Sequence, residues 1–508
     1  MKTTQIKTAF DNNKYLLAQK KAILGRVAKG EGRLYLEFGG KLIGDFHAAR
    51  VLPGYDPDVK IELLKQLSKK ADIIICIHSE DIAKRKMRAD YGISYEQAAL
   101  KLIDDLRGHG IEATAVVITR YKGQASVLDF KKRIEKHGMK VFFHESIDGY
   151  PTDIKKIASP KGFGRLPYIP VTQQLVVVTG PGPNSGKMGT CLSQIYHETI
   201  DGKQARYAKF ETFPVWDMPL NHPVNVAYEA ATADLRDYNA IDNFHLEAYH
   251  KKVVNYNRDL QAFPLLKALL NKITGGKVVY QSPTDMGMNC VARGIVDDDA
   301  TKVASNEEIM RRYFQYNAAW RMGSDDDDTA VERMGEILLK VELDPNDRPV
   351  VKAARAAAQE CENQKRGDGG IFCGAAIRLH DEKVITGKNS AIMHSASSMI
   401  LNALKYLAEI PDSQHLLQPD IMESVASYKD GLGTSSRKSL NLNETLIILV
   451  VSASRDIYAK RALDSLYLLK QCDVHLSHVP GRGDEAGMRH LGCSYTYDPV
   501  SPTKKLFA

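Results

Sequence analysis

The amino-acid sequence predicts a multi-domain α/β protein built mostly on parallel, doubly wound sheets. Two observations predict this fold class. Residues 72–78 and 175–178 form apolar runs without polar alternation, which is typical of strands buried on both faces. Stretches with the spacing of amphipathic helices, such as 94–108, lie between the apolar runs. Strands and helices that alternate in this way form parallel sheets with helices on both sides.

The first predicted region, residues 1–165, holds most of these alternations. The two glycines after residue 38 favour a hairpin between 34–38 and 41–45. A stretch rich in Gly, Pro and Ser near 148–162 ends the region as a linker. The strands that we expect in this region are 34–38, 72–78, 113–119 and 140–144.

The second predicted region, residues 166–340, is organised around a strand, a glycine-rich turn and a helix in succession. Strand 175–178 leads into this turn, and a helix follows it. We expect the next strand at 205–212 and a further one at 277–281, which ends in a polar turn. A helical insert makes up much of the remainder.

The third predicted region, residues 341–508, is a C-terminal α/β domain. Its most apolar run, 445–453, predicts a strand that forms a βαβ unit with helix 455–470 and strand 473–479. A helix at 393–408 opens with His394 and several serines. These polar residues either line a site or cap the helix, and the sequence leaves both interpretations open.

Composition narrows the class of protein. The chain has 508 residues, a net charge of +7 and no apolar run long enough to span a bilayer. The N-terminus lacks the apolar core of a signal peptide, so we expect a cytoplasmic protein without a membrane partner. Seven cysteines without paired spacing argue against a disulfide framework. The modest positive charge suits anionic small molecules as ligands. Aromatic residues are not interleaved with the densest basic run, so we do not expect nucleic acid as a partner.

The turn after strand 175–178 has the order of a phosphate-binding P-loop. Its glycines let the backbone approach an anion, the helix N-terminus adds positive potential, and Lys187 supplies a point charge. The spacing departs from the standard motif, because Pro181 stands at the first glycine position and Met188 replaces the usual magnesium-binding hydroxyl. A turn that binds nothing is the alternative. The expected nucleotide-binding residues are Gly180, Gly182, Asn184, Ser185, Gly186, Lys187, Met188 and Thr190.

Residues 172–215 resemble the dethiobiotin-synthetase-like branch of P-loop enzymes. The resemblance rests on a loop lengthened by one residue, counted from Gly180, and on Lys209 in the next predicted strand. It implies that Lys209 faces the phosphate site and bridges to the acceptor. Burial of a lysine late in a covered strand is costly without an anion. A structural ion pair with Glu211 or Glu229 is the alternative.

A P-loop enzyme also needs a carboxylate near the loop to hold Mg²⁺ through water. Asp285, in the polar turn that ends the stretch 277–287, is the first candidate, and Asp234 is the second. Thr190 and Ser185 are both candidates for the missing hydroxyl, and the spacing does not choose between them. Turn or capping roles are the alternative for both aspartates. Cysteines and histidines between 472 and 493 do not predict zinc, because strand alternation turns His475 and His478 to opposite faces.

Three further strings, at 207–214, 282–287 and 496–502, resemble an uncharacterised bacterial family of conserved hypothetical proteins with a domain of unknown function. This resemblance spans the whole chain and implies no activity. From the loop we expect an ATP-dependent enzyme that transfers phosphate to, or activates, an acidic small molecule. Lys187, Lys209 and Asp285 would be its catalytic residues. The sequence leaves open the acceptor, the oligomeric state and whether ATP is hydrolysed.

Two other function classes remain open at this point. One is a nucleotide-binding regulatory or scaffold protein without turnover, which Met188 in the hydroxyl position favours. The other is an α/β enzyme that binds a phosphorylated substrate at the loop and uses no ATP.

Overall fold

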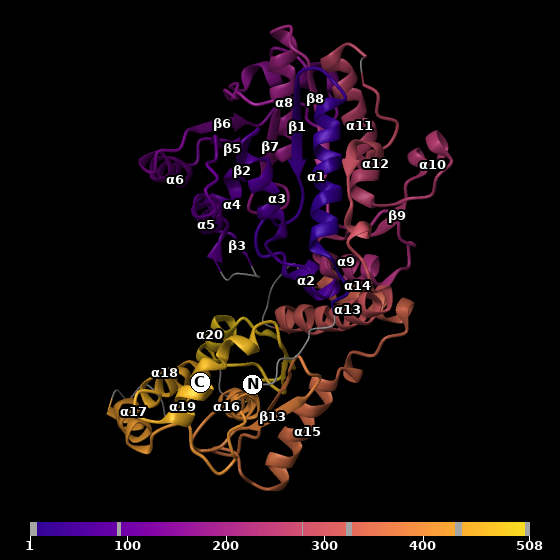
Figure 1. Cartoon of the computed structure of the whole chain (residues 1–508). Helices are drawn as coiled ribbons and strands as arrows, with labels where there is room; N and C mark the ends of the chain where they lie inside the picture. The colour runs from indigo at the N-terminus through magenta and orange to yellow at the C-terminus, as the bar shows by residue number, and fades with distance from the viewer. Residues whose placement is uncertain (1–7, 89–92, 277, 322–327, 432–438, 503–508) are drawn as a thin grey trace. The chain divides into compact units, whose positions relative to one another are not determined.

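The computed structural model describes residues 8–88, 93–276, 278–321, 328–431 and 439–502 (Figure 1). The chain divides into two compact units. The larger unit comprises 8–229 and 237–305, and the smaller unit comprises 230–236 and 306–508. Each unit has its own sheet.

The larger unit is built on a seven-stranded sheet in which every strand pairs in parallel. This result confirms the prediction of a parallel α/β sheet. Runs such as 175–179 are buried at every position, as expected for strands covered on both faces. The strand order is β11 (Gly287–Met288), β8 (Ala205–Phe210), β1 (Arg33–Phe38), β7 (Leu175–Thr179), β2 (Ala71–His78), β5 (Ala115–Tyr121) and β6 (Val141–Glu145).

Helices cover both faces of this sheet. On one face Tyr35, Val176 and Tyr207 pack in a core with α8 (Lys187–Ile200) and α11 (Asn257–Thr274). Strand alternation turns Phe38 and Phe210 to the other face, where their rings stack with centroids 4.0 Å apart. Lys60 of α3 (Val59–Ser68) lies over the Phe210 ring, which places α3 on that second face. Helices α1 (Asn12–Ala28) and α5 (Tyr95–Gly108) contact β1 and β2, respectively.

Shorter elements complete the larger unit. Two antiparallel pairs, β3 (Met87–Arg88) with β4 (Ile93–Ser94) and β9 (Asn239–Ile241) with β10 (Val254–Tyr256), lie outside the main sheet. The other helices are α2 (Phe46–Val51), α4 (Ser79–Ala83), α6 (Ala125–Lys136), α7 (Ile154–Ile157), α10 (Asn243–Tyr249) and α12 (Pro283–Met286), while α9 (Pro223–Ala231) and α13 (Asp298–Arg321) continue into the smaller unit.

The smaller unit is built on a mixed four-stranded sheet. Its order is β13 (Val384–Lys388), β12 (Gly374–Arg378), β14 (Asp473–Leu476) and β15 (Ser494–Tyr497), and only β14 and β15 pair in parallel. Its helices are α14 (Asp328–Val341), α15 (Pro349–Asn363), α16 (Ser395–Leu407), α17 (Pro419–Gly431), α18 (Leu442–Ser452), α19 (Ile457–Asp464) and α20 (Arg482–Leu491).

The predicted strand at 445–453 is wrong, because these residues belong to helix α18. An apolar run does not by itself distinguish a strand from a buried helix. The deciding signal lies just before the run, where Asn441 and Glu444 form a reciprocal capping box at the helix start. The βαβ unit expected at 445–479 is therefore absent from the described residues.

Two further strand predictions in the larger unit need correction. The hairpin between 34–38 and 41–45 does not form, because β1 is a central strand with parallel neighbours on both sides. Residues 278–281 form no strand, and the edge strand β11 begins only at Gly287. The main sheet also takes strands from both sides of residue 165, so the first two predicted regions share one sheet.

Candidate functional site

The connections after β1 and β7 leave the sheet in opposite directions. The chain runs from β1 through α2 and α3 to β2, whereas it runs from β7 through α8 to β8 on the far side of β1. A crevice opens at the carboxyl ends of two such strands, and open α/β sheets bind their ligands there. The topology therefore places the candidate site beside the ends of β1 and β7.

The loop of residues 180–187 occupies this position and has a defined backbone. Asn184 and Gly186 adopt left-handed conformations with φ of 54° and 87°. A Cβ on Gly186 would lie 2.7 Å from the side chain of Thr119, and one on Gly180 would lie 2.4 Å from the Cys76 carbonyl oxygen. Both positions therefore need glycine, and both hold the loop against the ends of β2 and β5.

Lys187 begins α8 and folds back over the loop. Its Nζ donates to the carbonyl oxygen of Gly182 at 3.3 Å and to the Ser185 hydroxyl at 3.4 Å. Among the residues that the structure describes, no carboxylate lies within ion-pair distance of this ammonium group. The Thr119 hydroxyl donates to the Ser185 carbonyl oxygen at 2.9 Å and fixes the loop from the other side. The loop therefore presents a half-buried cation that is held only by neutral oxygen atoms.

The two residues expected to complete the loop point elsewhere. Thr190 is buried, and its hydroxyl lies 3.4 Å from the Cys76 Sγ, which donates to it. Met188 packs against the core beneath α8. The Ser185 hydroxyl remains at the loop itself, where it accepts from Lys187.

A second polar group lies at the ends of β1 and β8, and we call it the Lys209 cluster. It consists of Glu37, Tyr207, Lys209, Glu211, Tyr256 and Asp259. The Lys209 ammonium lies 2.6 Å from oxygens of both Asp259 and Glu211, and it also donates to the Tyr256 hydroxyl. The structural ion pair considered as the alternative for Lys209 is thus present, with Glu211 and with Asp259 rather than with Glu229.

Glu37 links this cluster to the loop strand. It sits opposite Lys209 in the register of β8 and opposite Val178 in the register of β7, so these side chains share one face of the sheet. The Tyr207 hydroxyl donates to Glu37 Oε2 at 2.7 Å. Glu37 is therefore a carboxylate on β1, between β7, which leads into the loop, and β8, which carries Lys209.

Burial controls protonation within the Lys209 cluster. Burial raises the pKa of Glu211 to about 8, even though the adjacent ammonium of Lys209 acts in the opposite direction. Burial disfavours the charged form of Lys209, but Asp259 and Glu211 outweigh it and raise the lysine pKa. We therefore expect a charged Lys209 and a Glu211 that exchanges a proton near neutral pH.

The two aspartates predicted as magnesium ligands belong to other elements than the strands beside the loop. Asp285 belongs to α12 beside the edge strand β11, and β8 and β1 separate that strand from β7. Its carboxylate accepts from the Tyr249 hydroxyl at 2.9 Å and from the Gln281 amide at 3.1 Å. Asp234 belongs to the smaller unit, where it accepts from the Tyr316 hydroxyl at 3.1 Å.

Sequence reasoning missed Glu37, Tyr256 and Asp259. Glu37 had a usable signal, because it is the one acidic residue in the buried strand Leu34–Phe38, and a buried carboxylate carries the same desolvation cost as Lys209. Tyr256 and Asp259 follow Lys209 by 47 and 50 residues. No local pattern connects them to β8.

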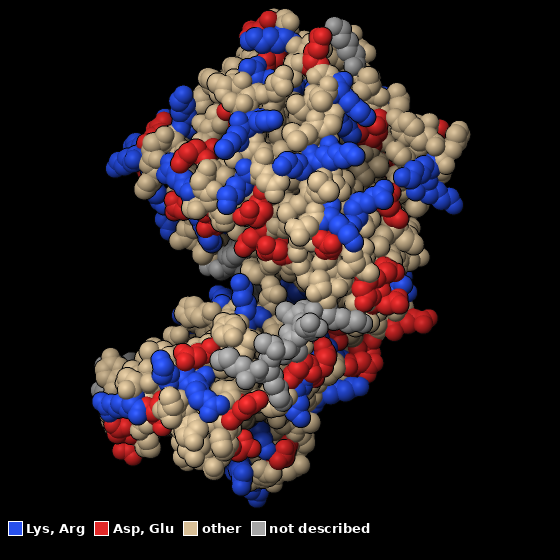
Figure 2. All heavy atoms as spheres, in the orientation of Figure 1, with Lys and Arg blue, Asp and Glu red and all other residues tan. Residues whose placement is uncertain are grey.

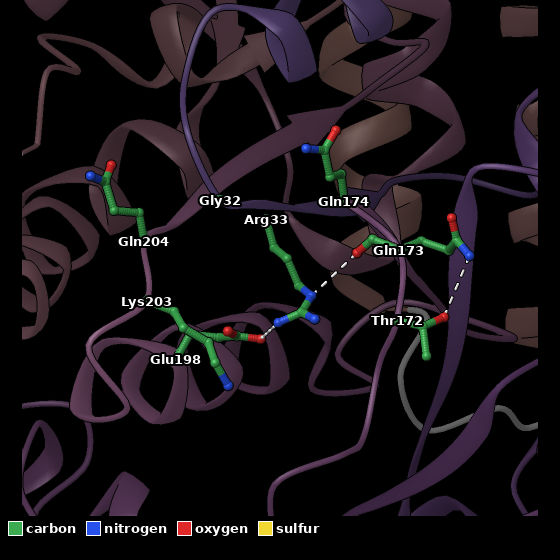
Figure 3. A pocket seen from close by; sticks show the side chains of 8 residues that line it. All are labelled: Gly32, Arg33, Thr172, Gln173, Gln174, Glu198, Lys203 and Gln204. Carbon is green, nitrogen blue, oxygen red and sulfur yellow. Dashed lines mark hydrogen bonds and ion pairs between the residues drawn. The ribbon is translucent and has the colours of Figure 1, made fainter.

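A cavity of about 220 Å³ lies at the amino ends of β1, β7 and β8, opposite the carboxyl ends that hold the loop (Figure 3). Arg33 occupies its centre and forms a 2.5 Å ion pair with Glu198, and it also donates to the carbonyl oxygens of Val171 and Gln173. The guanidinium of Arg33 is therefore already paired with groups of the protein itself. The lining residues are Gly32, Arg33, Thr172, Gln173, Gln174, Glu198, Lys203 and Gln204.

Other features bear on ligands and partners. Across the described residues, no group of three or more His, Cys, Asp or Glu side chains is arranged to hold a metal ion. None of the described helices is both long and apolar enough to cross a membrane. On the face shown in Figure 2, Lys and Arg are interspersed with Asp and Glu.

Comparison with known proteins matches the whole chain to one family. Residues 8–342 match the model described as "Domain of unknown function DUF1846, N-terminal", and residues 346–507 match its C-terminal counterpart. UPF0371 proteins of Clostridium botulinum (strain Alaska E43) and Clostridium tetani are each 46% identical over 502 residues, which is 99% of both chains. A UPF0371 protein of Clostridioides difficile is 46% identical over 503 residues, covering 99% of this chain and all of its own.

Proposed function

Because the chain belongs to the DUF1846 family, whose name carries no activity, we propose a function from the site itself. We propose an enzyme that binds ATP at the 180–187 loop and either transfers the γ-phosphate to an acceptor or uses it to activate the acceptor. The acceptor would be an acidic small molecule bound toward the Lys209 cluster. In this proposal the loop is a phosphate-binding loop of the P-loop kind.

The observation that carries the proposal is the environment of Lys187. Within the described part of the chain its ammonium contacts a carbonyl oxygen and a hydroxyl and no carboxylate, at 3.3 and 3.4 Å, both long for charge-assisted hydrogen bonds. It stands at the N-terminus of the 14-residue helix α8, where the helix dipole and the first amides also attract an anion. A cation and a helix start without a carboxylate partner support a phosphate ligand.

Magnesium fits this site only in part. Met188 offers no ligand, and the Thr190 hydroxyl is turned toward Cys76 in the core. Glu37 is the best carboxylate available, because it lies near the carboxyl end of β1, the strand beside β7, and shares a face with Val178. We propose Glu37, in place of Asp285 or Asp234, as the residue that holds Mg²⁺ through water, with the ion neutralising charge on the phosphates.

The Lys209 cluster supports an acceptor site with a modified role for the lysine. The contacts with Asp259, Glu211 and Tyr256 occupy its ammonium donors, so a direct bridge to the acceptor would have to displace one of them. We propose instead that Lys209 positions Glu211. A carboxyl group with a pKa of about 8 is suited to exchange a proton with an acceptor near neutral pH.

The second candidate function is nucleotide binding without turnover. The orientation of Thr190 and the presence of Met188 favour it, because both remove the hydroxyl that usually holds magnesium at such a loop. A third candidate, binding of a phosphorylated substrate without ATP, would use the same loop.

Two measurements separate these candidates. Isothermal titration of the full chain with ATP and with glucose 6-phosphate, each with and without Mg²⁺, identifies the ligand. Steady-state phosphate release then distinguishes turnover from binding alone. The proposal predicts saturable ATP binding and phosphate release that falls when Glu37 is changed to Gln. Binding of the sugar phosphate alone, or ATP binding without phosphate release, would refute it in favour of the corresponding alternative.

A further inference from the structure

In the smaller unit, one edge of the mixed sheet gathers several polar side chains. Strands β13 and β14 run in the same direction, because both are antiparallel to β12, and β15 is parallel to β14. The carboxyl ends of β13, β14 and β15 therefore meet at one edge. Helix α16 follows β13 and helix α20 follows β14, so both helices begin at this edge.

A histidine and an aspartate from these two helix starts are hydrogen-bonded to each other. His394 immediately precedes α16, and its Nδ1 lies 2.7 Å from Oδ2 of Asp484, which is in the first turn of α20. The other oxygen of Asp484 accepts from the Leu442 amide at 2.9 Å, and the side chain is only 1% exposed.

This contact fixes the tautomer of the imidazole. An ionised carboxylate only accepts hydrogen bonds, so His394 Nδ1 carries the proton and Nε2 is left as a proton acceptor. The His394 side chain is 33% exposed, so a small molecule can reach the ring. A carboxylate behind an imidazole in this arrangement orients it and stabilises the imidazolium form.

Both helices leave their first amides without a side-chain cap. The side chain of His394 is used for Asp484, and the corresponding residue of α20 is Gly481. By contrast, the neighbouring helix α18 has a complete capping box. Uncapped amides at a helix N-terminus are donors for an oxyanion.

Two buried polar atoms at the same place lack partners. His478 follows β14 and is 8% exposed, and among the described residues its Nδ1 has no hydrogen-bond partner. Burial lowers its pKa to about 4, and Asp484 and His394 are among the titratable groups close enough to influence it. The hydroxyl of Ser395, the first residue of α16, is also buried and without a partner. Leaving such buried groups unpaired is unfavourable, and a bound polar ligand would supply the missing partners.

From this arrangement we propose a second active site in the smaller unit, in which His394 is the general base for hydrolysis of a small ester or amide and Asp484 is its positioning residue. A water molecule gives its proton to His394 Nε2 while its oxygen bonds to the carbonyl carbon. The amides at the start of α16 hold the resulting oxyanion. The oxyanion then collapses, the bond to the leaving group breaks, and the leaving group takes the proton from the imidazolium.

The test uses the full chain and p-nitrophenyl acetate as the probe. We expect hydrolysis above the rate with free imidazole and a decrease of roughly 100-fold or more in His394→Asn, the usual size of a general-base contribution. The matched control is His415→Asn, which changes an exposed histidine of the same unit and should retain the wild-type rate. No hydrolysis by the wild type, or an unchanged rate in folded His394→Asn, would overturn the proposal.

A second readout separates positioning from structure. In ¹⁵N-histidine spectra of the wild type we expect a proton on His394 Nδ1 and none on Nε2 at pH 8. We expect Asp484→Asn to shift this tautomer and to lower the rate. Should that variant fail to fold, the wild-type spectrum alone decides, because a proton on Nε2 would contradict the role of Asp484.

Discussion

Two lysines stand near the carboxyl ends of strands that flank β1, and their surroundings differ. Lys209 on β8 lies 2.6 Å from two carboxylates, whereas the contacts of Lys187 after β7 with the residues that the structure describes are to neutral oxygens, at 3.3 and 3.4 Å. A buried ammonium with carboxylate partners is satisfied within the protein, and removal of one partner is costly. An ammonium without them remains available to an anion from solution. The comparison assigns stability to Lys209 and ligand binding to Lys187.

The largest effect should follow from Lys209→Ala. This change leaves the buried Glu211 and the partly buried Asp259 without their cation, and breaking a buried pair typically costs about 3–5 kcal/mol. We expect the free energy of unfolding of the larger unit to fall by that order in urea titrations. Lys203→Ala is the control, because Lys203 is exposed and pairs only with Asp201 on the surface. A loss below about 1 kcal/mol for Lys209→Ala would show that the cluster is not structural.

Lys187→Ala should produce the opposite pattern. Without ligand, its thermal midpoint should stay close to that of the wild type, because no carboxylate is left unpaired. The rise of the midpoint on addition of ATP should largely disappear, since a hydrogen bond to a charged group contributes about 1.5–3 kcal/mol, or roughly 10- to 100-fold in affinity. Differential scanning fluorimetry with increasing ATP measures both quantities. An unchanged ATP response in folded Lys187→Ala would exclude the loop as the phosphate site.

The pKa of Glu211 predicts a pH dependence of stability. Its folded-state pKa of about 8 lies above the ordinary value of 4.5, so the folded protein binds the proton more tightly than the unfolded chain does. Its contribution is therefore fully present below pH 4.5 and is lost progressively as the pH rises to about 8. Urea unfolding at pH 5.5, 7 and 8.5 should show this loss in the wild type and a flatter profile in Glu211→Gln. Equal slopes for the two proteins would contradict the assignment.

Asp285→Asn should have the smallest effect. The edge position of β11 separates this residue from the loop by two strands, and its carboxylate already accepts from Tyr249 and from the Gln281 amide. We expect ATP affinity within about twofold of the wild type, which corresponds to less than about 0.5 kcal/mol. A tenfold loss measured by isothermal titration would return Asp285 to the magnesium site and displace Glu37.

The parallel sheet could be predicted because its strands carry a strong local signal. Residues 72–78 and 175–178 are short, continuously apolar runs between helical stretches, and burial on both faces requires that pattern. Run 445–453 is also continuously apolar, but it lies in a helix that begins with a capping box. Ile447 and Val450 in this run are 60% and 54% exposed, unlike residues of a strand that is covered on both faces. Periodicity alone does not separate these cases.

The candidate site was only partly accessible from sequence. The glycine loop and Lys187 lie in one continuous segment, so the local order of strand, turn and helix indicates them. Of the partners of Lys209, Glu211 is adjacent in sequence, whereas Tyr256 and Asp259 come from β10 and α11. The strand between β7 and β8 is β1, which is also distant in sequence. Strand order and side-chain partners of this kind depend on tertiary packing.

A crystal structure of the full chain soaked with ATP and Mg²⁺ tests whether the 180–187 loop binds phosphate. We expect density for the β- and γ-phosphates against the amides of 184–187, with the Lys187 ammonium moved from the Gly182 carbonyl oxygen onto a phosphate oxygen. Density for the nucleotide elsewhere, for example in the cavity around Arg33 and Glu198, with Lys187 still on Gly182, would contradict it.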